Sequence, residues 1–211
     1  MFIGHFAVGF GMKRLAPNTS FTLLLTAPLL LDLLWPIFLV TGIERAGLNP
    51  GAPTRYLTLD LQYYPWSHSL LMAVAWSLAF AALARTRRGA ICLGIGVFSH
   101  WVLDFVTHRP DIALWPGGAA RVGLGLWYST AGTAITESLM YVAGVALFLR
   151  STRARTVWGH VSAWSLILFL SVGYVMTLVG PPPPSFEAVR YASLATWLIV
   201  PWAYWIERTR S

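Results

Sequence analysis

The sequence predicts an all-α, polytopic membrane protein with six transmembrane helices and one shorter apolar helix at its start. Of its 211 residues, 56% are hydrophobic and 11% are charged, whereas soluble globular domains carry about 25% charged residues. Six separate segments also reach the roughly 17–25 apolar residues that a spanning helix needs. We therefore expect a single integral-membrane helical domain over residues 1–211.

Each predicted spanning helix is a long apolar run bounded by polar or basic residues. In chain order these runs are Ser20–Thr41, Ser67–Ala84, Gly89–Thr107, Thr130–Leu149, Val157–Val179 and Phe186–Ile206. Met1–Met12 is apolar too but is too short to span upright, so we predict a re-entrant, tilted or partly inserted helix. The four prolines at 181–184 predict a rigid turn between the last two helices.

The basic residues predict the orientation of these helices. The formal net charge is +7, and most of it lies in three clusters that alternate with loops poorer in basic residues. The clusters are Arg85, Arg87 and Arg88; Arg150, Arg153 and Arg155; and Arg208 and Arg210. Cytoplasmic loops of membrane proteins are enriched in Lys and Arg, so we expect these clusters and the C-terminus to be cytoplasmic, in a bacterial inner membrane. The sequence has no basic face with interleaved aromatic residues, so we do not expect nucleic-acid binding.

This orientation places two long loops, Gly42–Trp66 and His108–Ser129, on the outer side. Both are rich in aromatic residues, including Tyr63, Tyr64 and Trp127. Aromatic residues commonly lie at a bilayer interface, which is the simplest interpretation. The more specific hypothesis is that the loops form a lid over a cavity that opens to the outer leaflet.

His100 and Asp104 lie four residues apart inside the apolar run Gly89–Thr107. Ionisable groups in the hydrocarbon layer cost a few kcal/mol each even on lenient insertion scales, and they usually indicate function. Positions i and i+4 share one helix face, so both side chains are presented together. Cys92 is the only cysteine, which excludes a disulfide framework and a thiolate zinc cluster within one chain.

Other ionisable residues fall at a similar depth under the predicted orientation. Asp32, His68 and Glu137 lie in the middle or outer half of the membrane, and His5 lies in the short first helix. Imidazoles and carboxylates without thiolates suit Zn²⁺, with Mn²⁺ or Fe²⁺ also compatible. We predict a metal site, mainly within residues 1–149, whose ligands are His5, Asp32, His68, His100 and Asp104. Glu137 and Asp104 are the predicted catalytic carboxylates.

Several residues have other interpretations. A single histidine in a membrane helix is often only a hydrogen-bonded contact between helices. His108 continues the face of His100 and Asp104 but lies at the membrane edge, so its role as a ligand stays open, and His160 lies beside the cytoplasmic arginines at the wrong depth. The acidic residues in loops or near segment ends are expected to be solvated, with Asp111 able to reach the site: Glu44, Asp60, Asp111, Glu187 and Glu207.

These motifs resemble the YdjM-type family of membrane-bound metal-dependent hydrolases, also called LexA-binding, inner membrane-associated hydrolases. The resemblance covers roughly Met1 to Leu149. It rests on I-G-H-F-A-V-G with His5, A-P-L-L-L-D-L-L-W with Asp32, S-H-S with His68, S-H-W-V-L-D with His100 and Asp104, and L-W-P at 114–116. The resemblance implies that His5, Asp32, His68, His100 and Asp104 are the metal and active-site residues. It predicts a reaction class but no protein partner.

The sequence departs from the family pattern at two points. Many relatives have P-D-x-D in the first acidic motif, where only Asp32 is present here, which weakens the case for a two-metal centre. A His-Arg pair often precedes the S-H-S-type motif, whereas Tyr64-Pro65-Trp66 precede it here. Arg109 or Arg121 would then have to replace the missing substrate-binding cation.

The leading hypothesis is metal-dependent hydrolysis of an ester or phosphodiester, in a lipid or lipid-linked substrate because the site lies at membrane depth. A transporter or metal-binding membrane protein could use the same residues as an ion path, although no internal repeat typical of many transporters is visible. A metal-independent lipid phosphatase needs a Lys-x6-Arg-Pro motif and an arginine about six residues before the histidine. Neither is present, since position 94 is glycine. A purely structural role leaves the common depth of these residues unexplained.

Overall fold

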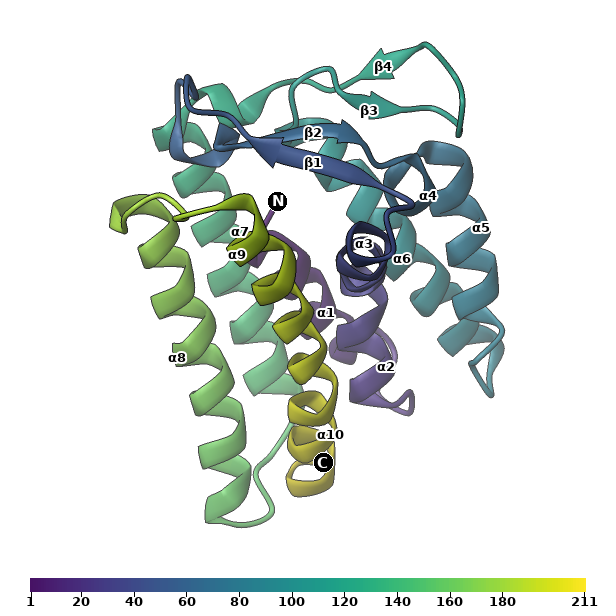
Figure 1. Ribbon diagram of the computed structural model, residues 1–211. Helices are drawn as coiled ribbons and strands as arrows, with labels where there is room; N and C mark the ends of the chain where they lie inside the picture. The colour runs from purple at the N-terminus through teal and green to yellow at the C-terminus, as the bar shows by residue number, and fades with distance from the viewer.

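The computed structural model describes all 211 residues as a mainly helical protein whose long helices run roughly side by side (Figure 1). The all-α prediction needs one correction, because two small antiparallel sheets are present. β1 (Arg45–Leu48) pairs with β2 (Leu59–Tyr63), and β3 (Ile112–Ala113) pairs with β4 (Arg121–Val122). These strands lie in the two long outer loops, where pairing satisfies backbone groups that no helix satisfies.

Four helical segments are long and apolar enough to cross a membrane. They are Phe21–Val40, which comprises α2 (Phe21–Thr26), η1 (Ala27–Leu29) and α3 (Leu30–Val40), then α6 (Arg87–Thr107), α7 (Thr130–Ser151) and α8 (Val157–Val179). The chain is therefore an integral membrane protein, but the prediction of six spanning helices is not confirmed. The two remaining apolar runs are divided into shorter elements.

The predicted helix Ser67–Ala84 is interrupted at Ser69. The structure has α4 (Pro65–His68) and α5 (Leu70–Ala81), and Ser69 between them has an extended backbone with ψ of 154°. The Ser69 hydroxyl accepts a hydrogen bond from the amide of Met72 and so caps α5. Serine is a strong N-cap residue, which explains why a new helix begins inside an apolar run.

The last apolar run, Phe186–Ile206, also departs from a single α-helix. It forms α9 (Phe186–Ala192), the 3-10 helix η4 (Ser193–Leu198) and α10 (Ile199–Thr209). The tighter η4 segment packs beside α3, and the Trp197 indole donates to the Leu33 carbonyl at 2.9 Å. This contact joins the last third of the chain to the helix that carries Asp32.

The first helix, α1 (Ile3–Leu15), confirms the predicted short apolar helix and lies in the interior of the helical layer (Figure 1). Its residues Ile3, Phe6 and Phe10 are buried in a core shared with α2, α7, α8 and α10. A Cβ added to Gly144 on α7 would lie 2.3 Å from the carbonyl oxygen of Ala7. Glycine at this position therefore permits the close backbone approach that is typical of membrane helix packing.

The arginine-rich segments lie at one end of the molecule and both hairpins lie at the other (Figure 1). At the arginine end, the amide of Arg153 donates to the carbonyl of Ser211, and the buried Arg210 donates to Thr152 and to the carbonyl of Gly159. The Arg210 guanidinium is therefore hydrogen-bonded within the protein. The separation agrees with the predicted orientation, and the cytoplasmic location of the C-terminus stays a prediction.

Candidate metal centre

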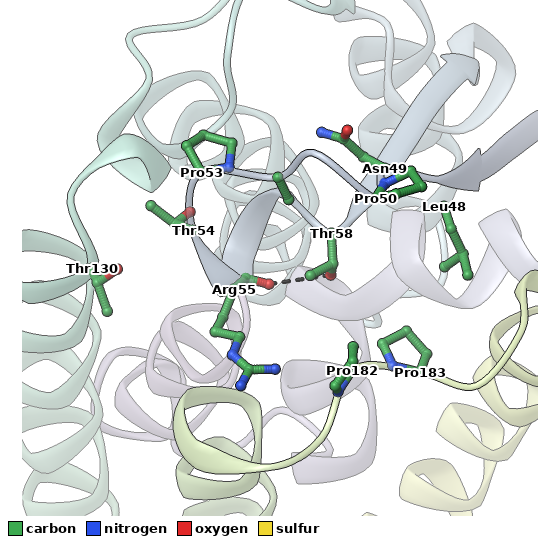
Figure 2. A pocket seen from close by; sticks show the side chains of 11 residues that line it. Leu48, Asn49, Pro50, Pro53, Thr54, Arg55, Thr58, Thr130, Pro182 and Pro183 are labelled. Atoms are coloured by element: carbon green, nitrogen blue, oxygen red, sulfur yellow. Dashed lines mark hydrogen bonds between the residues drawn. The ribbon is translucent and has the colours of Figure 1, made fainter.

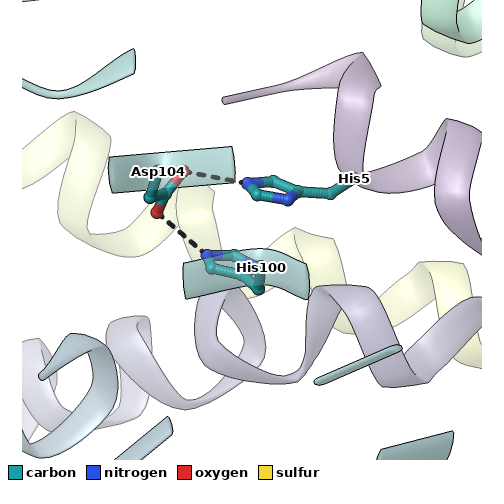
Figure 3. Close-up of side chains that lie close together, drawn as sticks. All are labelled: His5, His100 and Asp104. Atoms are coloured by element: carbon teal, nitrogen blue, oxygen red, sulfur yellow. Dashed lines mark hydrogen bonds and ion pairs between the residues drawn. The ribbon is translucent and has the colours of Figure 1, made fainter. Parts of the chain in front are cut away.

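All five predicted metal ligands come together near the hairpin end of the spanning helices. His5 lies on α1, Asp32 on α3, His68 on α4, and His100 and Asp104 on α6. The three histidines and Asp104 are buried, and the Asp32 side chain is 39% exposed. Two groups of three could hold a metal ion: His5 with His100 and Asp104, and Asp32 with His68 and His100. Figure 3 shows the first group.

Four donor atoms define what we call the donor set: Asp32 Oδ1, His68 Nε2, His100 Nε2 and Asp104 Oδ2. The two Nε2 atoms are 3.3 Å apart. Asp32 Oδ1 lies 3.6 Å from His68 Nε2 and 3.8 Å from His100 Nε2. Asp104 Oδ2 lies 3.1 Å from His100 Nε2 and 3.8 Å from His68 Nε2.

These five separations, 3.1–3.8 Å, lie near the edge length of a tetrahedral metal site. A tetrahedron with metal–ligand distances of about 2.0–2.1 Å places its ligand atoms about 3.3 Å from one another. Two imidazole nitrogens and two carboxylate oxygens are a donor set that Zn²⁺ accepts. The five separations are compatible with a single small divalent cation, in agreement with the absence of a second acid from the first acidic motif.

The tautomer of His100 is fixed by a backbone carbonyl. His100 Nδ1 lies 2.8 Å from the carbonyl oxygen of Pro28, and a carbonyl can only accept, so Nδ1 carries the proton. Pro28 lies in the 3-10 turn η1, where the absence of a proline N–H interrupts regular α-helical hydrogen bonding. When the His100 ring is neutral, this tautomer leaves Nε2 unprotonated and facing the donor set.

His68 is oriented in the same sense by a serine and a buried glutamate. The Ser67 hydroxyl donates to Glu44 Oε2 at 2.7 Å, and Glu44 Oε1 accepts from the Ser67 amide at 2.8 Å. Because that hydroxyl proton points to Glu44, its oxygen, 2.6 Å from His68 Nδ1, accepts the proton of Nδ1. The lone pair of His68 Nε2 therefore also faces the donor set.

Glu44 corrects the expectation that it is solvated. Its residue exposure is 1%, and burial raises the pKa of its carboxyl. Groups that bind the second nitrogen of a metal-ligating histidine hold the ring and its tautomer in place. No residue pattern around Glu44 indicates this role, since it lies in the loop between α3 and β1 and reaches Ser67 only through the tertiary fold.

His5 lies against His100 instead of completing the donor set. The two rings stack with a centroid separation of 3.7 Å and an interplanar angle of 3°. His5 Nε2 is 3.1 Å from Asp104 Oδ1, the oxygen that also contacts the Met1 amino group at 2.5 Å. Asp104 therefore contacts Met1 and His5 through Oδ1, and it contacts His68 and His100 through Oδ2. His5 Nδ1 is buried without a hydrogen-bond partner.

His108 approaches the cluster from the side of the two hairpins. Its Nε2 lies 3.6 Å from Asp104 Oδ2, and its Nδ1 lies 3.2 Å from Asp111 Oδ1. Asp111 also accepts from the Tyr64 hydroxyl at 2.7 Å. Asp111 thus reaches the site only through His108, and its hydrogen bond orients the His108 ring so that Nε2 faces Asp104.

The two arginines considered as substitutes for the missing cation are engaged elsewhere. Arg109 donates to Asp111 at 2.9 Å and to Asp60 at 2.7 Å, and its hydrogen bond lowers the pKa of Asp60. Arg121 donates to the carbonyls of Gly118 and Ala120. Asp60 pairs with Arg109 while its side chain stays 41% exposed, in agreement with the expectation that it is solvated. The residues that line the cavity at the donor set include neither arginine.

Glu137 contacts the start of α1 and belongs to neither group that could hold a metal. Its Oε2 accepts from the amides of Phe2 at 2.8 Å and Gly4 at 3.2 Å, and its Oε1 is buried without a partner. A carboxylate on the free amides at a helix start satisfies donors that have no partner within the helix. The arrangement supports a role in positioning α1, while the catalytic role of Glu137 stays a prediction.

A small cavity of about 120 Å³ adjoins the donor set. It is lined by Met1, Asp32, Trp35, Leu59, Leu61, Tyr64, His68, Asp104, His108 and Trp127. Leu59 and Leu61 come from β2, and Trp127 comes from η3 (Leu126–Tyr128). The outer loops therefore cover the site, which agrees with the hypothesis of a lid.

A separate hollow of about 530 Å³ lies over the outer loop and the proline turn (Figure 2). It is lined by Arg55, Thr58 and Pro182 among others, and by none of the five predicted metal ligands. Arg55 also borders a neighbouring hollow of about 340 Å³. These polar surface hollows are distinct from the cavity at the donor set.

We predict that Glu44→Gln weakens metal binding by roughly 10–100-fold, the usual effect of changing a group that orients a metal ligand. The amide keeps the size of the side chain but can donate to Ser67, which allows the Ser67–His68 hydrogen bond to reverse. Metal titration of the apo-protein in detergent measures the effect. Glu187→Gln, an exposed acid on α9, is the matched control. Equal metal affinity in both variants would contradict the orienting role.

Glu137→Gln distinguishes the two roles of Glu137. Its amide oxygen can still accept from Phe2 and Gly4, so a positioning role predicts near-normal hydrolysis in Glu137→Gln and a loss in Glu137→Ala. A general base would instead lose roughly 10²–10⁴-fold in both variants, since the amide cannot take a proton. We expect the first pattern, measured as kcat of the metal-loaded protein.

Comparison with protein families gives one match. The family of YdjM inner membrane proteins matches residues 64–180, more than half of the chain. This range contains His68, His100, Asp104 and Glu137, extends beyond the resemblance seen to Leu149, and begins after His5 and Asp32. No curated protein and no solved structure matches the chain. On this family match, and with spanning helices as expected for an inner membrane protein, the chain belongs to the YdjM inner membrane protein family.

Proposed function

We propose that this protein is a membrane-embedded, metal-dependent hydrolase of an ester or phosphodiester in a lipid or lipid-linked substrate. One observation carries the proposal. The Nε2 atoms of His68 and His100 face each other at 3.3 Å, and two carboxylates lie beside them. A divalent cation bound between the two nitrogens would satisfy both lone pairs and balance the charges of the two carboxylates.

Asp32, His68, His100 and Asp104 would hold the cation, with Zn²⁺ as the first expectation. A metal in such a site supplies Lewis acidity and a hydroxide-like nucleophile at neutral pH. The neutral histidines leave the charge of the cation to be balanced by Asp32 and Asp104. His5 closes one side of the site by stacking on His100.

His108 is the side chain of this site that is best placed to move a proton. It lines the 120 Å³ cavity, and Asp111 holds its Nδ1 proton, so its Nε2 can accept or release a proton toward the cavity. A carboxylate that orients a histidine in this way is a recurrent arrangement in hydrolases. We assign His108 the transfer of a proton to the leaving group.

Lipid is the favoured substrate class because of where the donor set lies. Asp32, His100 and Asp104 belong to two helical segments that are long enough to span a membrane. The cavity beside them is covered by β2 and η3 on the outer side. A water-soluble substrate would have to reach this depth past the loops, whereas a lipid already lies at it.

The test uses full-length protein purified in mild detergent. We expect elemental analysis to find one divalent transition metal per chain, and we expect chelation to abolish ester or phosphodiester hydrolysis. Re-addition of Zn²⁺ or Mn²⁺ should restore activity. Full activity in chelator would instead favour a metal-independent phosphatase. Metal flux in proteoliposomes without turnover of any lipid would favour a transporter, and either result would overturn the proposal.

A further inference from the structure

A second cavity of about 380 Å³ adjoins the metal centre from within the helical layer. Its walls come from α1, α3, α8 and the segment from Ala192 to Ile199, and they include Phe2, Phe6, Leu29, Phe169 and Leu170. We call it the chain cavity. It shares two lining residues, Asp32 and Trp35, with the 120 Å³ cavity at the donor set.

The lining of the chain cavity suits hydrocarbon. Asp32 is its only charged residue and lies where the two cavities meet, while the rest is aliphatic or aromatic apart from two hydroxyls, Ser193 and Thr196. Ala192 and Ala195 are exposed and small, so this wall is open toward the surface of the helical layer. A polar head group would find no charged partner here beyond Asp32.

The two volumes divide the substrate into two parts. Sites for small molecules typically measure about 300–1,000 Å³, a range that includes the chain cavity and excludes the 120 Å³ cavity at the donor set. The smaller cavity has room for a scissile group but not for a lipid. The apolar part of a lipid substrate therefore needs a second place, and the adjoining cavity provides one.

Trp35 stands at the junction of the two cavities. Its indole Nε1 is buried and has no hydrogen-bond partner in the protein. An unpaired buried donor of this kind costs free energy, and a substrate oxygen at the junction would satisfy it. Trp35 thus supplies an uncharged donor at a site that Arg109 and Arg121 do not reach.

We infer that the chain cavity binds the single hydrocarbon chain of a long-chain ester or phosphoester, with its scissile bond beside Asp32 and Trp35. This inference rests on the proposed hydrolase function. Hydrolysis breaks the bond from the acyl carbon or phosphorus to the leaving oxygen. The oxygen of one water forms the new bond, and a proton passes to the leaving oxygen.

Ala195→Trp tests the inference by filling the exposed mouth of the chain cavity. The probes are p-nitrophenyl butyrate and p-nitrophenyl palmitate, which share a leaving group and differ in chain length. In Ala195→Trp, we expect kcat/KM for the palmitate to fall at least tenfold further than kcat/KM for the butyrate. Ala188→Trp is the matched control, since Ala188 is exposed on α9 but does not line the cavity. Equal loss on both esters would contradict the inference.

A second readout does not depend on turnover. A diazirine-labelled C16 fatty acid should crosslink to Phe169 or Thr196 in the wild type and in His100→Ala, and much less in Ala195→Trp. Labelling spread evenly over the lipid-facing helices would overturn the chain site, whatever the enzyme does. Site-specific labelling without metal-dependent hydrolysis of either ester would leave the chain site intact and reject the proposed function.

Trp35→Phe examines the donor separately from the cavity. Removal of one such donor from an active site costs roughly 10²–10³-fold in kcat, and we expect a loss at the lower end on both esters. Fatty-acid labelling should persist because an aromatic ring remains. Unchanged kcat would remove Trp35 from the proposed substrate contacts.

Discussion

His100→Ala is expected to abolish metal binding and to lower hydrolysis by more than the roughly 100-fold that changes around a metal ligand produce. His100 belongs to both groups of residues that could hold the metal. It contacts His68, Asp104 and the Pro28 carbonyl, and it stacks on His5. No other side chain belongs to both groups.

Elemental analysis and the ester assays measure this effect on the same preparation. His160→Ala is the matched control, because His160 is exposed and lies on α8 at the arginine end. His68→Ala provides a second test if His100→Ala fails to fold, since the Ser67–Glu44 contact does not depend on the His68 ring. Retention of stoichiometric metal in both ligand variants would reject the donor set.

Gly144→Ala is expected to disrupt the site without altering any residue in it. The new Cβ would lie 2.3 Å from the Ala7 carbonyl oxygen and 2.7 Å from the Ala7 Cα, and both are backbone atoms that no rotamer change can move. Overpacking typically costs about 1–3 kcal/mol. Relief of this steric clash requires α1 to shift away from α7. Because His5 lies on α1 only two residues before Ala7, this shift would also move His5.

Gly173→Ala on α8 makes the same change where space exists. A Cβ there would meet only the Phe2 ring, at 3.7 Å, which is ordinary van der Waals contact. We expect a lower unfolding temperature and reduced metal content in Gly144→Ala, and near-normal values in Gly173→Ala. If the two variants behave alike, the α1–α7 contact does not position the metal centre.

The residues of the metal cluster could be predicted from sequence because hydrocarbon makes each ionisable side chain conspicuous. His100 and Asp104 also have fixed helical spacing, so their common face follows from the chain alone. Glu44 could not be predicted in the same way. It lies in a loop where carboxylates are usually solvated, and only the fold of the outer segment brings it to Ser67.

The number of spanning helices was the weaker part of the prediction, for a local reason. Hydropathy averages over a window and does not register a single capping residue such as Ser69. It likewise does not distinguish the 3-10 segment Ser193–Leu198 from α-helix. Both departures involve residues of the proposed sites. Ser69 follows α4, the short helix that carries His68, and the 3-10 segment Ser193–Leu198 forms part of a wall of the chain cavity.

The Glu44–Ser67–His68 contact joins parts of the molecule that face different solvents. Glu44 and Ser67 belong to the segments flanking the β1–β2 hairpin, while His68 meets ligands from helices in the bilayer. A ligand that binds only the folded arrangement stabilises it by mass action. Binding of the proposed metal would therefore be thermodynamically linked to the order of the β1–β2 hairpin. If the proposed metal is bound, its removal would loosen the β1–β2 hairpin, and faster proteolysis of residues 42–66 would report the loss of the metal.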